Sequence, residues 1–544
     1  MPITHEVMNQ VPPRTDVDEF AANTPLVEGV RTYEADWALD ALGTVGRQVG
    51  AEPFQRDADR ANRIEPELHT HNRYGNRIDE VEYDSSYSRI ISAAVAAGAH
   101  TGAWAQPRPG ANVARAATFM LFAQVEPGHA CPISMTHSAV PALSLSPDLA
   151  RQWMPRLLSR EYDGDLGGGG HPAKNSALFG MAMTEKQGGS DVRANTTRAV
   201  PADGAYLLTG HKWFCSAPMS DGFLALAQAP AGLSCFLLPR VLDDGSRNVF
   251  RIQRLKDKLG NRSNASSEVE FENTVAHLVG EEGRGVRTIL EMVSRTRLDC
   301  IFGTTAGMRQ GVAEAAWHVR HREAFGRLLV DQPAMTAVLA DLALESEAAT
   351  ATALRLARAH DEDADAAELA FRRLATAVAK YWICKRGPEH AYEALECLGG
   401  NGYTETFPLA RRYREQPVMA IWEGSGNVIA LDVLRALARE PDSFEAFDAE
   451  VSTAAGVSSE FDTHLEATRA LVREVAASTP DAASRRARRL VADLALALQA
   501  SLLIRTAPAA VSDAFVASRL GQNRGHLYGE LPASVDLGAI IVRA

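Results

Sequence analysis

A carboxylate with aromatic and small neighbours is the first candidate for chemistry in this sequence. Glu423 follows Ile421 and Trp422 and precedes Gly424 and Ser425. A carboxylate held against apolar side chains can have a raised pKa, which a general base working near neutral pH needs. The alternative is a carboxylate that caps the helix starting near Ser425, because a helix N-terminus favours negative charge. The segments described next favour the base.

A glycine-containing loop follows a short apolar run in MAMTEKQGGSD, residues 181–191. The β-type run ends at Thr184, and Gly189 and Ser190 lie in the loop. Small residues let a backbone approach a flat ligand closely, and hydroxyl groups can form hydrogen bonds with that ligand. Without its flanks, Gly-Gly-Ser would indicate only an ordinary strand-to-loop segment.

A tryptophan beside small polar residues marks a second segment, GHKWFCSAP at residues 210–218. Trp213 on a strand could cover one face of a planar ring system, with Cys215 and Ser216 close by. The alternative is a tryptophan buried in a core.

An arginine-rich segment, RHREAFGR at residues 320–327, precedes Gln332. The planar fork of a guanidinium pairs well with phosphate oxygens. Standing alone, the segment would be equally typical of a solvated basic helix end. A further loop, ECLGGNGYTE at residues 396–405, contains Gly399 and Gly400 and permits close approach of the backbone to a ligand.

Together these strings resemble the motifs of the acyl-CoA dehydrogenase family. Residues 181–191 are similar to MTE-x-x-x-GSD, residues 212–216 to K-x-W-x-[TS], and residues 422–425 to aromatic-Glu-Gly-[ST]. Residues 322–332 are similar to R-x-x-F-G followed by Gln. The string TEKQGGSDV-x-x-N-T-T-R at residues 184–198 resembles the alkylation-response (AidB-like) branch in particular.

The resemblance implies an FAD cofactor and a role for each motif. Glu423 would remove the α-proton of an acyl thioester. Arg322 would bind the FAD pyrophosphate and Phe325 would pack on its adenosine part, from a neighbouring subunit. This implies a homo-oligomer, a tetramer built as a dimer of dimers. The residues expected to hold FAD are Met181, Met183, Thr184, Gly189, Ser190, Trp213, Cys215, Ser216, Arg322, Phe325, Gln332, Gly399, Gly400, Trp422, Gly424, Ser425 and Asn427.

Two positions depart from the family pattern. Cys215 stands where a hydroxyl residue is commoner, and a thiol is a weaker hydrogen-bond donor. Glu396 stands where many members have glutamine.

Four stretches of chain must position these segments. Residues 1–176 predict an extended arm followed by a mainly helical domain, and residues 177–285 contain short β-type runs separated by turns. Residues 286–440 predict long helices with short connections, with Pro388 at a bend or break, and a linker starts near residue 440. Residues 441–544 predict a further helical tail.

The expected fold class is therefore α+β and multidomain, with an acyl-CoA dehydrogenase-like order. It has an N-terminal helical domain, a central antiparallel β-barrel, a four-helix bundle, and an extra C-terminal helical domain.

The tail is the segment that could contact nucleic acid, although the net charge of -12 argues against nucleic acid as the main partner. The alternative is a solvated helix face with salt bridges. The resemblance implies binding of double-stranded DNA without marked sequence preference. The candidate phosphate-binding residues are Arg485, Arg486, Arg488, Arg489 and Arg519.

Other classes of protein are disfavoured. His318 and His321 lack an acidic or cysteine partner, so we expect no metal. The Rossmann and P-loop glycine motifs are missing from the sequence. The first 16 residues do not read as a signal peptide, and no apolar run is long enough for a membrane span, so we expect a cytoplasmic protein.

We therefore expect an FAD-containing, DNA-associated flavoprotein of the adaptive response to alkylation damage. Weak activity on a short or branched acyl-CoA thioester would remain. The alternative is a genuine metabolic acyl-CoA dehydrogenase with no nucleic-acid role.

Overall fold

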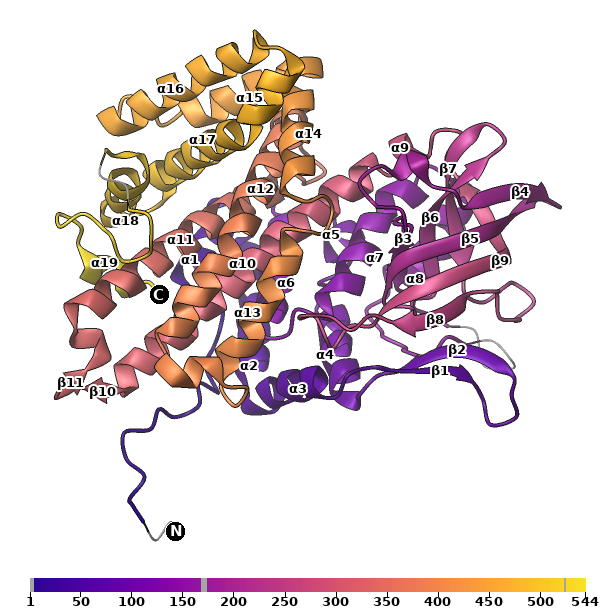
Figure 1. The fold of residues 1–544 in the computed structure, drawn as a ribbon, viewed down its shortest axis with the longest axis horizontal. Helices are drawn as coiled ribbons and strands as arrows, with labels where there is room; N and C mark the ends of the chain where they lie inside the picture. Colours follow the sequence, from indigo (N-terminus) through magenta and orange to yellow (C-terminus); the bar gives the residue numbers. More distant parts are fainter. Residues whose placement is uncertain (1–3, 168–173, 523–524) are drawn as a thin grey trace. The chain divides into compact units, whose positions relative to one another are not determined.

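A computed structural model describes residues 4–167, 174–522 and 525–544 of the chain (Figure 1). Two compact units are present, and each is built from separate stretches of sequence. Unit 1 contains Met1–Glu52, Arg108–Gln124 and Cys300–Ala544, and unit 2 contains Pro53–Pro107 and Val125–Asp299. The two units are described separately below.

Unit 2 is centred on a seven-stranded sheet that closes on itself (Figure 1). The neighbouring strands run in the order β3-β6-β4-β5-β9-β7, β7 also pairs with β6, and β8 pairs with β9. The expected β-barrel is thereby confirmed, with the difference that β3–β6 and β4–β6 are parallel pairs. The strands are β3 (Phe179–Ala182), β4 (Arg198–Ala202), β5 (Ala205–Ser216), β6 (Gly222–Ala229), β7 (Gly232–Pro239), β8 (Arg251–Leu255) and β9 (Ser266–Val279).

Strand β6 is apolar on both faces because both are covered. Successive side chains of a strand point to opposite sides. Phe223 and Ala225 therefore lie in the barrel core, whereas Leu224 and Leu226 pack against helices α7 (Ala130–Leu143) and α8 (Pro147–Leu157). The remaining helices of this part of the chain are α3 (Glu52–Arg63), α4 (Ser85–Ala96), α5 (Gly102–Ala105), η2 (Val192–Ala194) and α9 (Gly285–Thr288).

A β-hairpin interrupts the region that was expected to be mainly helical. Strands β1 (Glu67–His71) and β2 (Arg77–Glu82) pair antiparallel. The side chain of Asn72 accepts hydrogen bonds from the N–H groups of Tyr74 and Asn76, both at 3.0 Å, and so forms the turn. Asparagine favours such side-chain turns, and RIDEVE alternates as a half-buried strand does.

Unit 1 contains a bundle of long helices. Pro388 lies inside α12, which continues through it, so of the expected bend or break the break is wrong. A proline removes one backbone hydrogen bond, here to the carbonyl of Cys384, without ending a well-packed helix. The elements are α1 (Thr24–Thr32), η1 (Asp36–Ala38), α2 (Leu39–Gly50), α6 (Ala111–Ala123), α10 (Leu290–His321, from Cys300 on), β10 (Glu323–Ala324), β11 (Arg327–Leu328), η3 (Leu329–Asp331), α11 (Pro333–Arg358), α12 (Ala366–Glu396), η4 (Gly399–Tyr403), α13 (Pro408–Met419) and α14 (Gly426–Arg439).

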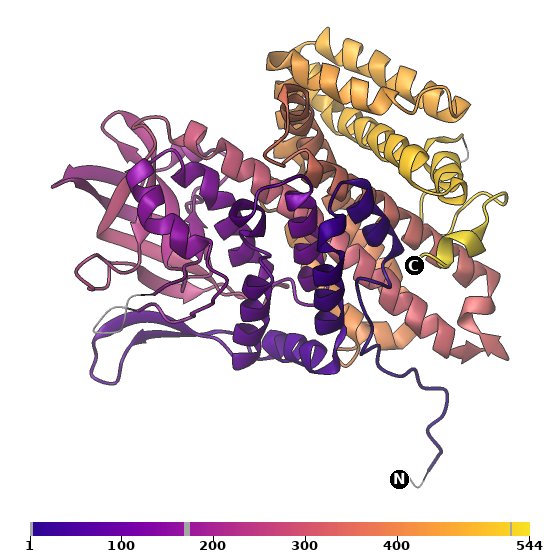
Figure 2. The same ribbon diagram turned by 180° about the vertical axis from the view of Figure 1, so that it is seen from behind.

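The tail also belongs to unit 1. Helices α15 (Pro441–Ser452), α16 (Ser459–Ala476) and α17 (Pro480–Thr506) pack together beside α12 and α14, as Figures 1 and 2 both show. The expected linker is wrong, because α15 begins at Pro441, and proline is favoured in the first helical turn. The chain ends with α18 (Ala509–Phe515), the π-helix η5 (Val516–Leu520) and α19 (Leu537–Ile541).

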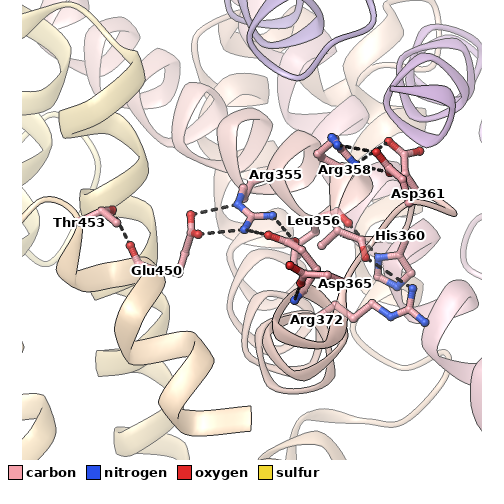
Figure 3. Close-up of polar contacts among 12 residues, drawn as sticks. Arg355, Leu356, Arg358, His360, Asp361, Asp365, Arg372, Glu450 and Thr453 are labelled. Carbon is pink, nitrogen blue, oxygen red and sulfur yellow. Dashed lines mark hydrogen bonds and ion pairs between the residues drawn. The ribbon is translucent and has the colours of Figure 1, made fainter. Parts of the chain in front are cut away.

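Buried ion pairs fasten the tail to the bundle. Arg355 of α11 donates to Glu450 of α15 at 2.9 Å (Figure 3). It also donates to Glu368 of α12 at 2.7 Å. Arg505 of α17 lies 2.6 Å from the same Glu450 carboxylate. In the part of the chain that the structure describes, no helix is long and apolar enough to cross a bilayer.

Candidate functional site

Two of the predicted segments meet in unit 2. The N–H of Trp213 on β5 donates to the carbonyl of Thr184 at 2.9 Å, which joins the end of β3 to the tryptophan strand. A Cβ at Gly189 would lie 2.5 Å from Oγ1 of Thr184, so this position needs glycine. Met181 and Met183 are half-buried against the barrel, whereas Ser190 is exposed in the loop.

A buried ion pair holds these two segments together, and the sequence did not single it out. Lys212 donates to Glu185 at 3.0 Å and to the carbonyl of Leu226 at 2.7 Å, with both charged side chains fully buried. Burial acts to raise the pKa of Glu185, but hydrogen bonds from Thr196 and Thr197 and the charge of Lys212 hold it below its usual range. Glu185 follows Thr184 and Lys212 precedes Trp213, and both of these neighbours were predicted to hold FAD. This adjacency was the signal in the sequence that could have found the pair.

Positive side chains surround the Trp213 ring. The ammonium of Lys256 lies 3.2 Å from the ring centroid, and Lys186 and Arg254 lie 5.5 and 5.7 Å away. Cations above an aromatic face are attracted by its quadrupole. The half-buried tryptophan therefore sits in a positively charged setting.

The side chain of Cys215 is directed elsewhere. It lies in the barrel core with no exposed surface, and burial raises the pKa of its thiol to about 12. Cys215 is thus a neutral core residue in this structure. Its neighbour Ser216 is half-buried, and its hydroxyl lies 3.1 Å from that of Ser266.

In unit 1, Glu423 lies in a strained loop immediately before α14. Its φ is +57°, in the left-handed region that non-glycine residues seldom adopt, and Gly424 follows with φ +109°. Such strain clusters at functional sites, because the surrounding structure must hold it in place. Trp422 packs beside Cys300, Cys384 and Met419, and Ser425 caps α14 without a side-chain hydrogen bond of its own.

Two cationic side chains contact this loop. Lys380 of α12 donates to the carbonyl of Gly424 at 2.6 Å, and Arg488 of α17 donates through Nε to Oδ1 of Asn427 at 2.8 Å. The sequence suggested neither contact.

The glycine loop lies in η4, after α12. Gly399 has φ +58°, and a Cβ on either Gly399 or Gly400 would meet open space. Both residues are exposed, so their backbone can be approached by a ligand. Gly402, in contrast, is required by packing, because a Cβ there would lie 2.1 Å from the carbonyl oxygen of Leu395.

The arginine motif forms a short hairpin of β10 and β11. Its tip consists of Phe325 (φ +55°) and Gly326 (φ +78°), and the Phe325 side chain is 95% exposed. Gln332 donates to the carbonyl of Ala324 at 3.0 Å and so ties the hairpin to the start of α11. Arg322 donates to the carbonyl of Asn9 in the N-terminal arm.

Four of the five candidate phosphate-binding arginines lie together on α17. Arg485, Arg486, Arg488 and Arg489 are all exposed near the start of this helix. Glu474 lies 2.5 Å from Arg486, and Asp493 lies 2.9 Å from Arg489.

The fifth arginine, Arg519, is not part of this set. Its guanidinium lies 2.5 Å from Asp341 and 3.1 Å from Glu345, both of which are buried carboxylates of α11. Arg519 therefore neutralises a buried acidic pair.

Comparison with known proteins identifies the family. Residues 9–164 match the N-terminal domain of the adaptive response protein AidB, residues 180–274 match the acyl-CoA dehydrogenase middle domain, and residues 283–438 match the acyl-CoA dehydrogenase C-terminal domain. The tail from Pro441 onwards lies beyond these three matches.

Individual relatives agree with this result. The chain is 47% identical over 445 residues to AidB of Escherichia coli (strain K12), which is named as an acyl-CoA dehydrogenase, covering 81% of this chain and 82% of that protein. It is 32% identical to acyl-CoA dehydrogenase family member 11 of Caenorhabditis elegans over 60% of this chain and 54% of that protein. The structure of Caenorhabditis elegans ACDH-11 in complex with C11-CoA superposes with a TM-score of 0.84 at 24% identity, covering 99% of this chain and 93% of that one.

Membership of one family thus accounts for the barrel, the helical bundle and the sequence motifs. The chain belongs to the acyl-CoA dehydrogenase family, whose members are FAD-dependent oxidoreductases, and within that family to the branch with the AidB N-terminal domain.

Proposed function

We propose that the chain oxidises a short or branched acyl-CoA thioester, with Glu423 as the base that removes the α-proton. The observation that supports this role is the strained, left-handed backbone of Glu423, with φ +57°, in the loop before α14. When bound, FAD would supply the acceptor for the hydride that leaves the β-carbon. Glu423 would take up the α-proton on its carboxylate, and a preorganised base of this kind contributes to rate by its position.

The residues present fit FAD in most respects. Gly189 leaves the backbone beside Thr184 open to a flat ligand, and Trp213 offers a half-buried ring. Gly424 and Ser425 precede α14, whose N-terminus carries partial positive charge suited to a ligand's negative groups. Cys215 is the exception, because its thiol lies in the barrel core, so we assign no flavin contact to that side chain.

The test is reduction of the bound flavin under anaerobic conditions. Purified protein should be yellow and release FAD on denaturation, and isovaleryl-CoA should bleach its visible absorption. Replacing Glu423 by Gln should slow bleaching by roughly 100-fold or more with FAD still bound. Bleaching at the wild-type rate in E423Q would place the base elsewhere, and a folded but colourless wild type would contradict the proposal as a whole.

We further propose that this activity is residual in a DNA-associated protein of the alkylation response. The supporting observations are the exposed row Arg485, Arg486, Arg488 and Arg489 and the likeness to AidB. Binding through arginines that neutralise phosphates weakens as salt concentration rises. The slope of the logarithm of the binding constant against the logarithm of salt concentration is about -0.9 for each phosphate contacted. The metabolic alternative, with no role for nucleic acid, would leave this row as a solvated helix face.

Duplex DNA binding separates these alternatives. In the triple variant R485E, R486E and R489E, affinity for a short duplex should fall and the salt slope should flatten. Arg473→Glu on α16 is the matched control, because Arg473 is exposed and outside the row. Equal affinities of the triple variant and wild type would favour the metabolic alternative.

We also propose a cytoplasmic homotetramer, a dimer of dimers. Phe325 is 95% exposed at a hairpin tip, and aromatic side chains are enriched at interfaces between subunits, which supports its insertion into a neighbouring subunit. All six cysteines are free thiols, which suits a reducing compartment. Light scattering of the FAD-loaded protein should give four times the mass of one chain, and Phe325→Asp should reduce that mass.

A further inference from the structure

The segment that carries the proposed base is contacted at both ends by cations from other helices. Lys380 of α12 lies 2.6 Å from the carbonyl oxygen of Gly424, the residue directly after Glu423. Arg488 of α17 lies 2.8 Å from the side-chain oxygen of Asn427, in the first turn of α14. These two cations therefore bracket the segment Glu423–Asn427.

The burial of Lys380 is energetically unusual. Its side chain is only 1% exposed, and its ammonium donates to the carbonyl oxygen of Gly424, which is a neutral group. A buried ammonium is expensive unless it is hydrogen-bonded or paired. The hydrogen bond of Lys380 is made to the carbonyl of Gly424, in the peptide between Gly424 and Ser425. The buried ammonium therefore stabilises this loop.

The loop itself would not be expected to hold its shape unaided. Two successive residues, Glu423 and Gly424, have positive φ. Non-glycine residues in this region are strained and persist only where the surroundings determine them. A short charge-assisted hydrogen bond to the carbonyl of Gly424 fixes the peptide that follows the strained residue.

Arg488 adds a contact from outside the family domains. The match to the acyl-CoA dehydrogenase C-terminal domain ends at residue 438, and α17 begins at Pro480. Lys385 of α12 lies over the middle of the segment, with Nζ 3.3 Å from the point where a Cβ on Gly426 would lie. Bundle and tail thus converge on the same few residues.

We infer that Lys380 and Arg488 are positioning residues that clamp the segment carrying Glu423, so that the tail is a working part of the dehydrogenase site. The inference rests on the proposed role of Glu423 as base. Neither cation needs to touch the substrate: each acts through the backbone or side chain of the segment that it holds.

Hydrogen–deuterium exchange of the holoprotein tests the clamp without reference to activity. Lys380→Met removes the ammonium at nearly constant length, and Arg488→Gln removes the guanidinium from an exposed position. Arg439→Gln, an exposed position at the far end of α14, is the matched control. Peptides covering residues 422–428 should exchange at least several-fold faster in K380M and measurably faster in R488Q. The exchange rate should be unchanged in R439Q and R488K.

Kinetics then decide whether the clamp positions the base. A displaced base should lower kcat by roughly 10- to 100-fold in K380M, with KM within about twofold and FAD retained. R488Q should show a smaller fall that R488K restores. Unchanged exchange in both variants overturns the clamp, and faster exchange with unchanged kcat overturns the positioning role. If wild type holds FAD but is not reduced by acyl-CoA, the proposed function fails, and the clamp is judged by exchange alone.

Discussion

Arg355 and Glu450 join the helical bundle to the tail through a buried ion pair. The guanidinium nitrogen Nη2 lies 2.9 Å from Oε2 of Glu450, and both side chains are largely buried (Figure 3). Burial acts to raise the pKa of the Glu450 carboxyl, but hydrogen bonds from Arg355 and Arg505 lower it below its usual value. The carboxylate therefore stays charged at the contact between α11, α15 and α17.

Replacing Arg355 by Met should loosen the tail. The change leaves Glu368 and Glu450 without their shared guanidinium, but Arg505 still pairs with Glu450. Leaving a buried charge without any partner costs about 3–5 kcal/mol, so we expect a smaller loss here, of roughly 1–3 kcal/mol. Urea unfolding should show that loss, and limited proteolysis should cleave within the tail first. Arg151→Gln, which removes an exposed pair with Asp148, should change stability by less than about 0.5 kcal/mol. Equal stabilities of R355M and R151Q would contradict the expectation.

The pair Lys212–Glu185 should matter both for stability and for the cofactor. Lys212→Met leaves the fully buried Glu185 carboxylate without its cation but with its hydrogen bonds from Thr196 and Thr197, so the free energy of unfolding should fall by about 3 kcal/mol. Because the pair joins the Thr184 and Trp213 segments, FAD should also be released more readily on dilution. Arg251→Gln is the control from the same sheet, since its pair with Glu272 is substantially exposed. Unaltered FAD retention in K212M would show that the pair serves the barrel alone.

Glu126 should make stability depend on pH in the acidic range. Its buried carboxylate accepts hydrogen bonds from Ser263 at 2.6 Å and from the N–H of His129 at 2.9 Å. Burial acts to raise the pKa of Glu126, but the hydrogen bond and charge of His129 and the Ser263 hydroxyl lower it from 4.5 to about 2. Because the pKa of Glu126 is lower in the folded state than in the unfolded chain, its carboxylate stabilises the folded state at pH values above the unfolded-state pKa of 4.5. This contribution is lost as the pH falls from 4.5 towards 2.

The corresponding measurement compares wild type with Glu126→Gln by urea unfolding between pH 7 and pH 3. At pH 7 wild type should be more stable by roughly 3 kcal/mol, as the size of the pKa difference implies. The advantage should narrow as the solution is acidified below about pH 4.5. An advantage that stays constant over this range would show that Glu126 contributes packing and not charge.

Arg519 should prove to be structural and not a DNA contact. Its replacement by Gln leaves Asp341 and Glu345 close together and buried, so the melting temperature should fall. The salt dependence of duplex DNA binding by the folded fraction should stay as in wild type. A flatter salt slope in R519Q would return this residue to the DNA-binding set.

The fold and the positions of the motifs could be predicted from the sequence because both are encoded by residues that are adjacent in the chain. The string around Thr184, the strand around Trp213 and the hairpin with Phe325 can each be read from adjacent residues. Contacts between distant residues could not be read in this way: Lys380 and Gly424 are 44 positions apart, Arg488 and Asn427 are 61, and Arg519 and Asp341 are 178.

The direction in which a strand residue points its side chain could not be predicted either. Cys215 occupies a position that the resemblance marks for flavin, but the register of β5 turns its thiol into the barrel core. A bulge between Lys212 and Cys215 shifts that register, and nothing in the local sequence announces it.

The scattered make-up of unit 1 bears on how the protein is synthesised. Helix α1 emerges early from the ribosome, yet Glu28 on that helix pairs with Arg543, at a nitrogen–oxygen distance of 2.5 Å. Translation at about 5–20 residues per second would separate the two partners by roughly half a minute or more. Helix α1 packs on α6 and α11, so it lacks this cover until α11 has been made, well before Arg543. Newly made chains should therefore leave part of unit 1 unpacked until α11 has been made, and the Glu28–Arg543 ion pair should form only when synthesis ends.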